Sequence, residues 1–150
     1  MLHVALFEPE IPPNTDNIAR LCAATGTRLH LIGRLGFRLD DRSLKRAGLD
    51  YWPSVDVVRH LTFAEFEAAM PGRVWCVECP AEMSYTRAEF RDGDCLLFGA
   101  ESKGLPAEVK ERYAARKIGI PMPTGAVRSL NLATSAGIVL YEALRQLNDW

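Results

Sequence analysis

The feature that most constrains the fold of this chain is a series of short apolar runs separated by segments with helical patterns. The runs lie at 2–7, 28–32, 55–58, 74–77, 95–98 and 117–120. Most are apolar almost throughout rather than at every second residue, which is typical of parallel strands covered on both faces. With 150 residues and 48% hydrophobic residues, the chain suits one domain spanning 1–150. We expect an α/β fold, a mainly parallel sheet with helices on both faces.

Capping residues and breakers indicate where the helices lie. We expect helices at 14–24, 40–47, 62–70, 106–113 and from 129 to the C-terminus. Asn14 is a good N-cap type after the proline-rich segment 8–13, which we expect to be non-helical. Thr62 and Glu65 have the spacing of a capping box, and Ser129 is the N-cap predicted for the last helix. The segment 84–90 is ambiguous.

The last helix has an unusual composition. No residue from Leu132 to Tyr141 is charged on any face. A helix that is apolar all round is normally buried on more than one side. In so small a protein we expect a partner chain to supply the second cover.

Other features bound the function. The apolar runs are too short to span a membrane and no signal peptide precedes the first strand, so we expect a cytoplasmic protein with reduced cysteines. The net charge of −1 argues against indiscriminate nucleic-acid binding. Cys76 and Cys79 form one CxxC pair without a second pair, and the three histidines are expected to form no cluster. We therefore expect no metal.

Three loops follow apolar strands and precede helices, which places them where ligands bind in such sheets. The loops contain Asn14-Thr-Asp-Asn-Ile-Ala-Arg20, Phe98-Gly-Ala-Glu-Ser-Lys-Gly104, and Ile120-Pro-Met followed by Ser129-Leu-Asn-Leu-Ala133. Together they resemble the three motifs of the SPOUT superfamily of RNA methyltransferases. The start Leu6-Phe-Glu-Pro-Glu-Ile-Pro-Pro-Asn-Thr15, with Arg46-Ala-Gly-Leu-Asp-Tyr51, is similar to its TrmL-like tRNA (cytidine/uridine-2′-O)-methyltransferases.

The resemblance implies methyl transfer from S-adenosyl-L-methionine to the ribose 2′-hydroxyl of the wobble nucleotide in the tRNA anticodon stem-loop. It also implies a homodimer and a deep C-terminal trefoil knot, although chains are normally unknotted. Methylation of another tRNA or rRNA site stays an alternative. So do a non-catalytic RNA-binding module and a small-molecule α/β binding protein.

The resemblance also assigns site residues. Cofactor binding falls to Val77, Gly99, Glu101, Gly104, Ile120, Met122, Ser129, Leu130 and Asn131. Without it, the glycines are ordinary turn residues and the glutamate a solvated one. The threonines common in the family after the central strand are here Glu78 and Cys79, and Asp16 stands where the family usually has glycine.

The catalytic candidates are Arg20, Asn17, Glu101 and Tyr141. Asn17 and Arg20 are three residues apart and share a helix face. A guanidinium stays protonated, so we interpret Arg20 as a group that binds phosphate or hydroxyl oxygen and stabilises alkoxide charge, rather than as a base. A core aromatic is an equally good interpretation of Tyr141.

A basic segment is the candidate RNA surface. The predicted RNA-binding residues are Arg34, Arg38, Arg42, Lys45, Arg46 and Arg128. Phe37, Tyr51 and Trp52 are nearby and offer rings on which unpaired bases can stack. A solvated charged face is the alternative.

Overall fold

The computed structural model describes residues 1–38 and 52–150. It contains a sheet of seven parallel strands in the order β3-β2-β1-β6-β4-β7-β5. The strands are β1 (His3–Phe7), β2 (Arg28–Ile32), β3 (Val57–His60), β4 (Val74–Val77), β5 (Met83–Ser84), β6 (Cys95–Phe98) and β7 (Lys117–Gly119). The predicted α/β fold with a parallel sheet is confirmed. The expected strand at 55–58 begins two residues later. The ambiguous segment begins at the last residue of β5 and contains a short 3-10 turn, Tyr85–Arg87.

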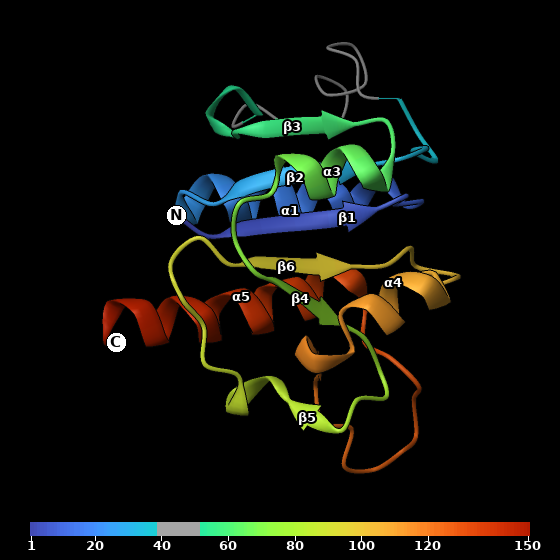
Figure 1. The fold of residues 1–150 in the computed structure, drawn as a ribbon, viewed down its shortest axis with the longest axis vertical. Coiled ribbons are helices and arrows are strands. Elements are labelled where there is room, and N and C mark those ends of the chain that lie inside the picture. The colour runs from blue at the N-terminus through green and yellow to red at the C-terminus, as the bar shows by residue number, and fades with distance from the viewer. Residues whose placement is uncertain (39–51) are drawn as a thin grey trace.

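Helices cover both faces of this sheet (Figure 1). Helices α1 (Pro12–Thr25) and α5 (Leu132–Asn148) lie on one face, and α3 (Phe63–Ala69) and α4 (Ala107–Arg112) on the other. Alternate residues of β1 enter two separate cores. Val4 and Leu6 pack with Ile18 and Leu140, whereas Ala5 packs with Phe66. The helix expected at 40–47 lies outside the described residues.

The first helix begins earlier than predicted. Asn14 is not its N-cap, because the helix starts at Pro12 and the cap position is Ile11, which makes no side-chain capping bond. Proline suits the first helical turn because its φ is already helical and it has no N–H to satisfy. The expectation that the whole proline-rich segment is non-helical is therefore wrong for Pro12 and Pro13. Because the helix begins before Asn14, the Asn14 side chain is available for another contact.

The last helix begins later than predicted. Asn131, not Ser129, is the N-cap of α5, and its Oδ1 accepts a hydrogen bond from the Thr134 N–H at 3.2 Å. The predicted cap of α3 is confirmed, since Thr62 Oγ1 accepts from the Glu65 N–H at 3.1 Å. Both helices thus satisfy an N-terminal donor with a side-chain oxygen.

The three histidines form a buried row, so the expectation that they would form no cluster is wrong. His3 Nδ1 lies 2.9 Å from His30 Nε2, and His30 Nδ1 lies 2.9 Å from His60 Nε2. They come from three adjacent strands, β1, β2 and β3. Burial, with a contribution from the neighbouring imidazoles, lowers the pKa of His30 to about 3. Burial also lowers the pKa values of His3 and His60.

The histidine row predicts destabilisation by acid. Unfolded His30 titrates near 6.5 but the folded residue does so near 3, so between these values the unfolded state holds one more proton. Neutral His30 therefore stabilises the folded state fully above pH 6.5. Between pH 6.5 and about 3, the free energy of unfolding falls by about 1.4 kcal/mol per pH unit as the pH drops. Urea unfolding at pH 7.5, 6 and 5 measures this slope. His30→Leu should make the slope shallower by about one proton, and an unchanged slope would contradict the assignment.

A buried carboxylate fixes the start of β6. Asp94 is 2% exposed and accepts hydrogen bonds from the guanidinium of Arg73, from Trp75 Nε1 at 2.9 Å and from the Arg91 N–H at 2.8 Å. These donors hold the pKa of Asp94 below its usual range against the opposing effect of burial. The Asp94 carboxylate therefore connects β4 and the turn before β6 to the start of β6.

Asp94→Asn removes the charge and should lower the free energy of unfolding by about 2–3 kcal/mol. Denaturant unfolding at neutral pH measures this loss. The exposed neighbour Asp92 is the matched control, and Asp92→Asn should cost less than about 1 kcal/mol. Equal losses in the two variants would show that the buried Asp94 carboxylate stabilises the fold no more than an exposed one.

None of the helices in the described ranges has the length and apolar content that a membrane crossing would require.

Candidate active site

A cavity of about 490 Å³ opens at the carboxyl ends of β4, β6 and β7, beside the start of α5. Its volume is within the 300–1,000 Å³ typical of small-molecule sites. Its lining residues come from all three motif loops and from the segment after β4. They are Ile11, Asn14, Val77, Glu78, Cys79, Phe98, Gly99, Ala100, Glu101, Ser102, Lys103, Gly104, Ile120, Arg128, Ser129, Leu130, Asn131, Leu132 and Ser135. The topology therefore brings segments more than 100 residues apart to one site.

Glu101 connects the loop after β6 to the start of α1. Its Oε1 accepts from the Glu10 N–H at 2.9 Å, and its Oε2 accepts from the Ile11 N–H at 2.7 Å. The two loops are joined in the other direction as well, since Glu10 Oε1 accepts from the Ser102 N–H at 2.9 Å and from its hydroxyl at 2.6 Å. The Ser102 hydrogen bonds lower the pKa of Glu10. The loop after β6 thus supplies a carboxylate that accepts from backbone N–H groups before α1, and the segment before α1 supplies one that accepts from a backbone N–H of the loop after β6.

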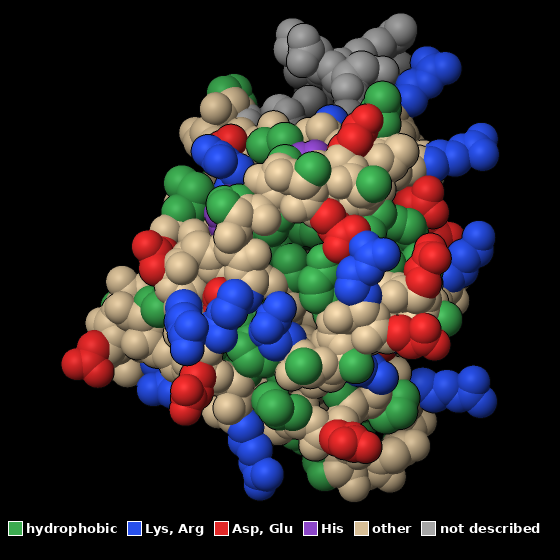
Figure 2. Space-filling view, viewed as in Figure 1, with side chains coloured by type: hydrophobic (Ala, Val, Ile, Leu, Met, Phe, Trp, Pro, Cys, Tyr) green, Lys and Arg blue, Asp and Glu red, His purple; other side chains and the backbone are tan. Residues whose placement is uncertain are grey.

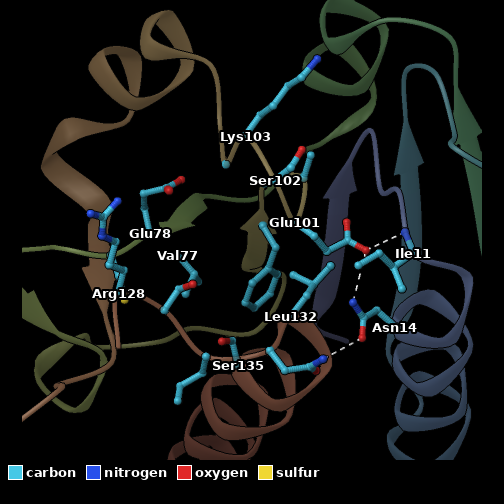
Figure 3. Close-up of a pocket in the computed structure, with 18 of the residues that line it drawn as sticks. Ile11, Asn14, Val77, Glu78, Glu101, Ser102, Lys103, Arg128, Leu132 and Ser135 are labelled. Carbon is cyan, nitrogen blue, oxygen red and sulfur yellow. Dashed lines mark hydrogen bonds between the residues drawn. The ribbon is translucent and has the colours of Figure 1, made fainter. Parts of the chain in front are cut away.

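Asn14 extends this connection to the third loop (Figure 3). Its Nδ2 donates to Glu101 Oε2 at 3.2 Å, and its Oδ1 accepts from Asn131 Nδ2 at 3.0 Å. Asn131 in turn caps α5. The three motifs are therefore joined by one hydrogen-bonded path, Glu101–Asn14–Asn131. Asn14 is 6% exposed, so these bonds satisfy most of its amide.

The loop after β6 folds back on itself at two glycines. A β-carbon on Gly99 would lie 2.2 Å from the Gly104 carbonyl carbon, so only glycine permits this closure. Gly104 has a φ of +66°, a conformation that other residues rarely adopt. The loop remains compact, and its backbone forms one wall of the cavity.

All of the residues predicted to bind cofactor line this cavity except Met122, which lies farther along the loop after β7. Arg128, predicted to bind RNA, also lines it. Glu78 and Cys79, which stand where the family has threonines, line the cavity as well. Ser102 and Lys103 also line it and were not among the predicted site residues, although both belong to the second motif. The sequence reasoning also missed Asn14, which was interpreted as a helix cap.

The remaining catalytic candidates lie outside the cavity. Asn17 and Arg20 are exposed on α1, and Asp16 precedes Arg20 by one turn on the same helix face. Burial raises the pKa of Asp16. Tyr141 lies on α5, 46% exposed, with its ring centroid 6.3 Å from that of Trp150. Within one chain, then, the structure does not bring Arg20 and Tyr141 to the cavity wall.

The predicted RNA-binding residues are only partly described. Arg34 and Arg38 are exposed after β2, whereas Arg42, Lys45 and Arg46 lie outside the described residues. Figure 2 shows acidic and basic side chains intermingled on the face that carries α3 and α4. The described part of that face therefore carries charges of both signs. In the described ranges, no group of three or more His, Cys, Asp or Glu residues is arranged to hold a metal ion.

A cavity enclosed by three loops at the carboxyl ends of a parallel sheet defines a small-molecule site of an α/β protein. The family model for the SpoU rRNA methylase family matches residues 1–141. The chain belongs to this family.

Individual relatives are similar over nearly the whole chain. The tRNA (cytidine(34)-2′-O)-methyltransferase of Escherichia coli K12 is 47% identical over 149 residues, which are 98% of this chain and 94% of the relative. A solved structure described as structural insights into the 2-OH methylation of C/U34 on tRNA is 53% identical, with a TM-score of 0.93, over 100% of this chain and 98% of that one.

A more distant structure was solved with a ligand. It is the SpoU methyltransferase AviRb from Streptomyces viridochromogenes in complex with the cofactor AdoMet, 26% identical with a TM-score of 0.84. The match covers 100% of this chain and 62% of that one.

Proposed function

We propose that this protein transfers a methyl group from S-adenosyl-L-methionine to the ribose 2′-hydroxyl of the wobble cytidine or uridine of tRNA. The observation that carries the proposal is the hydrogen-bonded path that joins the three motif loops around one cavity. The names of the relatives at 47% and 53% identity support the same substrate. The proposal covers residues 1–150 as one methyltransferase domain.

The residues of the cavity fit this cofactor. The backbone at Gly99 and Ile120 can lie against the adenine, because both residues line the cavity and strand-end N–H and C=O groups can hydrogen-bond a base edge. The N-terminus of α5 at Asn131 favours the methionyl carboxylate, since its N–H groups and the helix dipole attract anions. Arg128 lines the same part of the cavity. When bound, the cofactor would supply the electrophilic methyl group.

Arg20 is proposed as the group that positions the RNA and stabilises charge. Its planar guanidinium can hold a phosphate oxygen and the reacting 2′-oxygen at once, and it cannot act as a base because a guanidinium stays protonated. Asn17 shares its helix face and would contact the same nucleotide. Phosphate or water would accept the proton.

A homodimer would place Arg20 and Tyr141 beside a partner's cavity. The outer face of α5 is available for pairing, since a β-carbon on Gly137 would meet no atom of the described residues within 4 Å. One turn after Gly137, Tyr141 is 46% exposed, and its ring contacts that of Trp150, which is 66% exposed; such exposure is unusual for large apolar side chains in contact. We also propose that the segment 120–131, which returns from β7 to α5, forms a trefoil knot.

The proposed RNA surface consists of Arg34 and Arg38, together with Arg42, Lys45 and Arg46 from the segment outside the described residues. We place the protein in the cytoplasm, where unmodified tRNA is found.

The class of substrate is tested with radiolabelled S-adenosyl-L-methionine and purified protein. We expect labelling of bulk tRNA that lacks this modification, and none of ribosomal RNA. Labelling of ribosomal RNA alone would support the alternative target. Tight RNA binding without any cofactor binding in isothermal titration would support a non-catalytic RNA-binding module, and cofactor binding without tRNA affinity would support a small-molecule protein.

A further inference from the structure

The Glu78 carboxylate lines the cavity but takes no part in the path that joins the three loops. Glu78 follows Val77, the last residue of β4, and lies across the cavity from Glu101 and Asn14 (Figure 3). Its Oε2 accepts one hydrogen bond, from the Leu105 N–H at 3.1 Å. Glu101 already receives three donors. Of the two, Glu78 is therefore the carboxylate with acceptor capacity to spare.

Two neighbours fix the position of this carboxylate. The Leu105 N–H holds Oε2, and Gly104 leaves room for Oε1, since a β-carbon there would lie 2.6 Å from that oxygen. Among the described residues, no hydrogen bond reaches Oε1. Glu78 is partly exposed at the cavity, so a ligand hydroxyl can reach this oxygen and take the place of solvent.

We infer that Glu78 binds the ribose of the cofactor, with Oε1 accepting hydrogen bonds from its 2′- and 3′-hydroxyls. The inference rests on the proposed function, because it takes S-adenosyl-L-methionine as the ligand. An acidic side chain near the carboxyl ends of parallel strands serves this purpose in other nucleotide-binding sheets. Lys103 and Arg128 also line the cavity, but both are donors only and cannot accept from a hydroxyl.

A carboxylate could instead attract the sulfonium or the α-ammonium group, and a set of ligands separates these roles. S-Adenosylhomocysteine lacks the sulfonium, 5′-methylthioadenosine lacks the amino acid as well, and 2′,3′-dideoxy-S-adenosylhomocysteine lacks the ribose hydroxyls. Isothermal titration measures the dissociation constant of each for the wild type, Glu78→Ala and Glu82→Ala. Glu82 is exposed and does not line the cavity, so it is the matched control.

We expect Glu78→Ala to weaken binding of the three ligands that carry the hydroxyls by a similar factor, about 10- to 100-fold. Removing the hydroxyls should weaken binding to the wild type by about that factor and leave binding to Glu78→Ala unchanged. A direct contact between Glu78 and the hydroxyls predicts this non-additivity in a double-mutant cycle, in which one change is made in the protein and the other in the ligand. Glu82→Ala should match the wild type throughout.

Three results would overturn the inference. A loss confined to S-adenosyl-L-methionine would assign Glu78 to the sulfonium, and a loss that spares 5′-methylthioadenosine would assign it to the ammonium group. An equal cost of removing the hydroxyls in both proteins would mean that Glu78 only braces Leu105. If Glu78→Ala fails to fold, the same cycle is measured with Glu78→Gln, whose amide oxygen can keep the hydrogen bond from the Leu105 N–H. Absence of binding to the wild type would instead overturn the proposed cofactor.

Discussion

Arg20→Ala should lower kcat for tRNA methylation by about 100- to 1,000-fold, the usual cost of removing one group that stabilises developing negative charge. The dissociation constant for S-adenosyl-L-methionine should stay within about twofold, because Arg20 does not line the cavity of its own chain. Single-turnover methylation with saturating cofactor, combined with isothermal titration, measures both quantities. Arg87, an exposed arginine of the turn after β5, provides the control variant Arg87→Ala.

Arg20→Lys tests the geometry of this role. Lysine keeps the charge but is a point donor without the planar fork of a guanidinium, so we expect it to recover little of the lost rate. Near-normal turnover in Arg20→Lys would show that bidentate contact is unnecessary. A large rise in KM for tRNA with kcat unchanged would show that Arg20 only binds RNA.

Gly137→Asp should convert the proposed homodimer to a monomer. In the described part of the single chain, a β-carbon added at Gly137 has no neighbour within 4 Å. In a twofold interface each substitution introduces two carboxylates, and burying them should raise the dimer dissociation constant at least about 1,000-fold. Sedimentation equilibrium measures the association, and circular dichroism shows whether the monomer remains folded. Methylation should be lost with the dimer.

Ala136 would be a poor choice for the same test. It is fully buried in the chain's own core, so an aspartate there would unfold the protein whatever its oligomeric state. Ala115→Asp, on the exposed turn after α4, adds the same charge away from α5 and should leave association unchanged. A folded Gly137→Asp protein that still dimerises would refute the proposed interface.

Patterns within single segments predicted the fold well. Apolar runs located six strands within about two residues, and the Thr62–Glu65 spacing identified the start of α3, because these signals depend on local periodicity and capping. The errors occurred where a side chain serves a distant partner. Asn14 was predicted to be a helix cap. Its side chain instead joins Glu101 to Asn131, and Asn131 lies 117 residues after Asn14 in the chain.

The histidine row shows the same limit. His3, His30 and His60 meet only because β1, β2 and β3 pair in parallel with a particular register. His3 lies opposite Arg28, and His30 is two residues beyond Arg28 on β2. His30 lies opposite Val58, and His60 is two residues beyond Val58 on β3. Residues two apart on a strand share a face of the sheet, so the three histidines lie on the same face. Strand order and register are tertiary properties, which explains why sequence spacing indicated no cluster. The Glu78 oxygen near Gly104 likewise depends on two strands being neighbours.

If this cavity serves 2′-O-methylation of the wobble nucleotide, the modified nucleotide can be located in the tRNA product. The most direct measurement is nucleoside mapping, by mass spectrometry of nuclease fragments, of tRNA lacking the modification after incubation with purified protein and S-adenosyl-L-methionine. We expect 2′-O-methylcytidine or 2′-O-methyluridine at the first anticodon position, and about 100- to 1,000-fold slower formation of it with Arg20→Ala. A 2′-O-methyl nucleotide at another position, or a methyl group on a base, would contradict the proposed function.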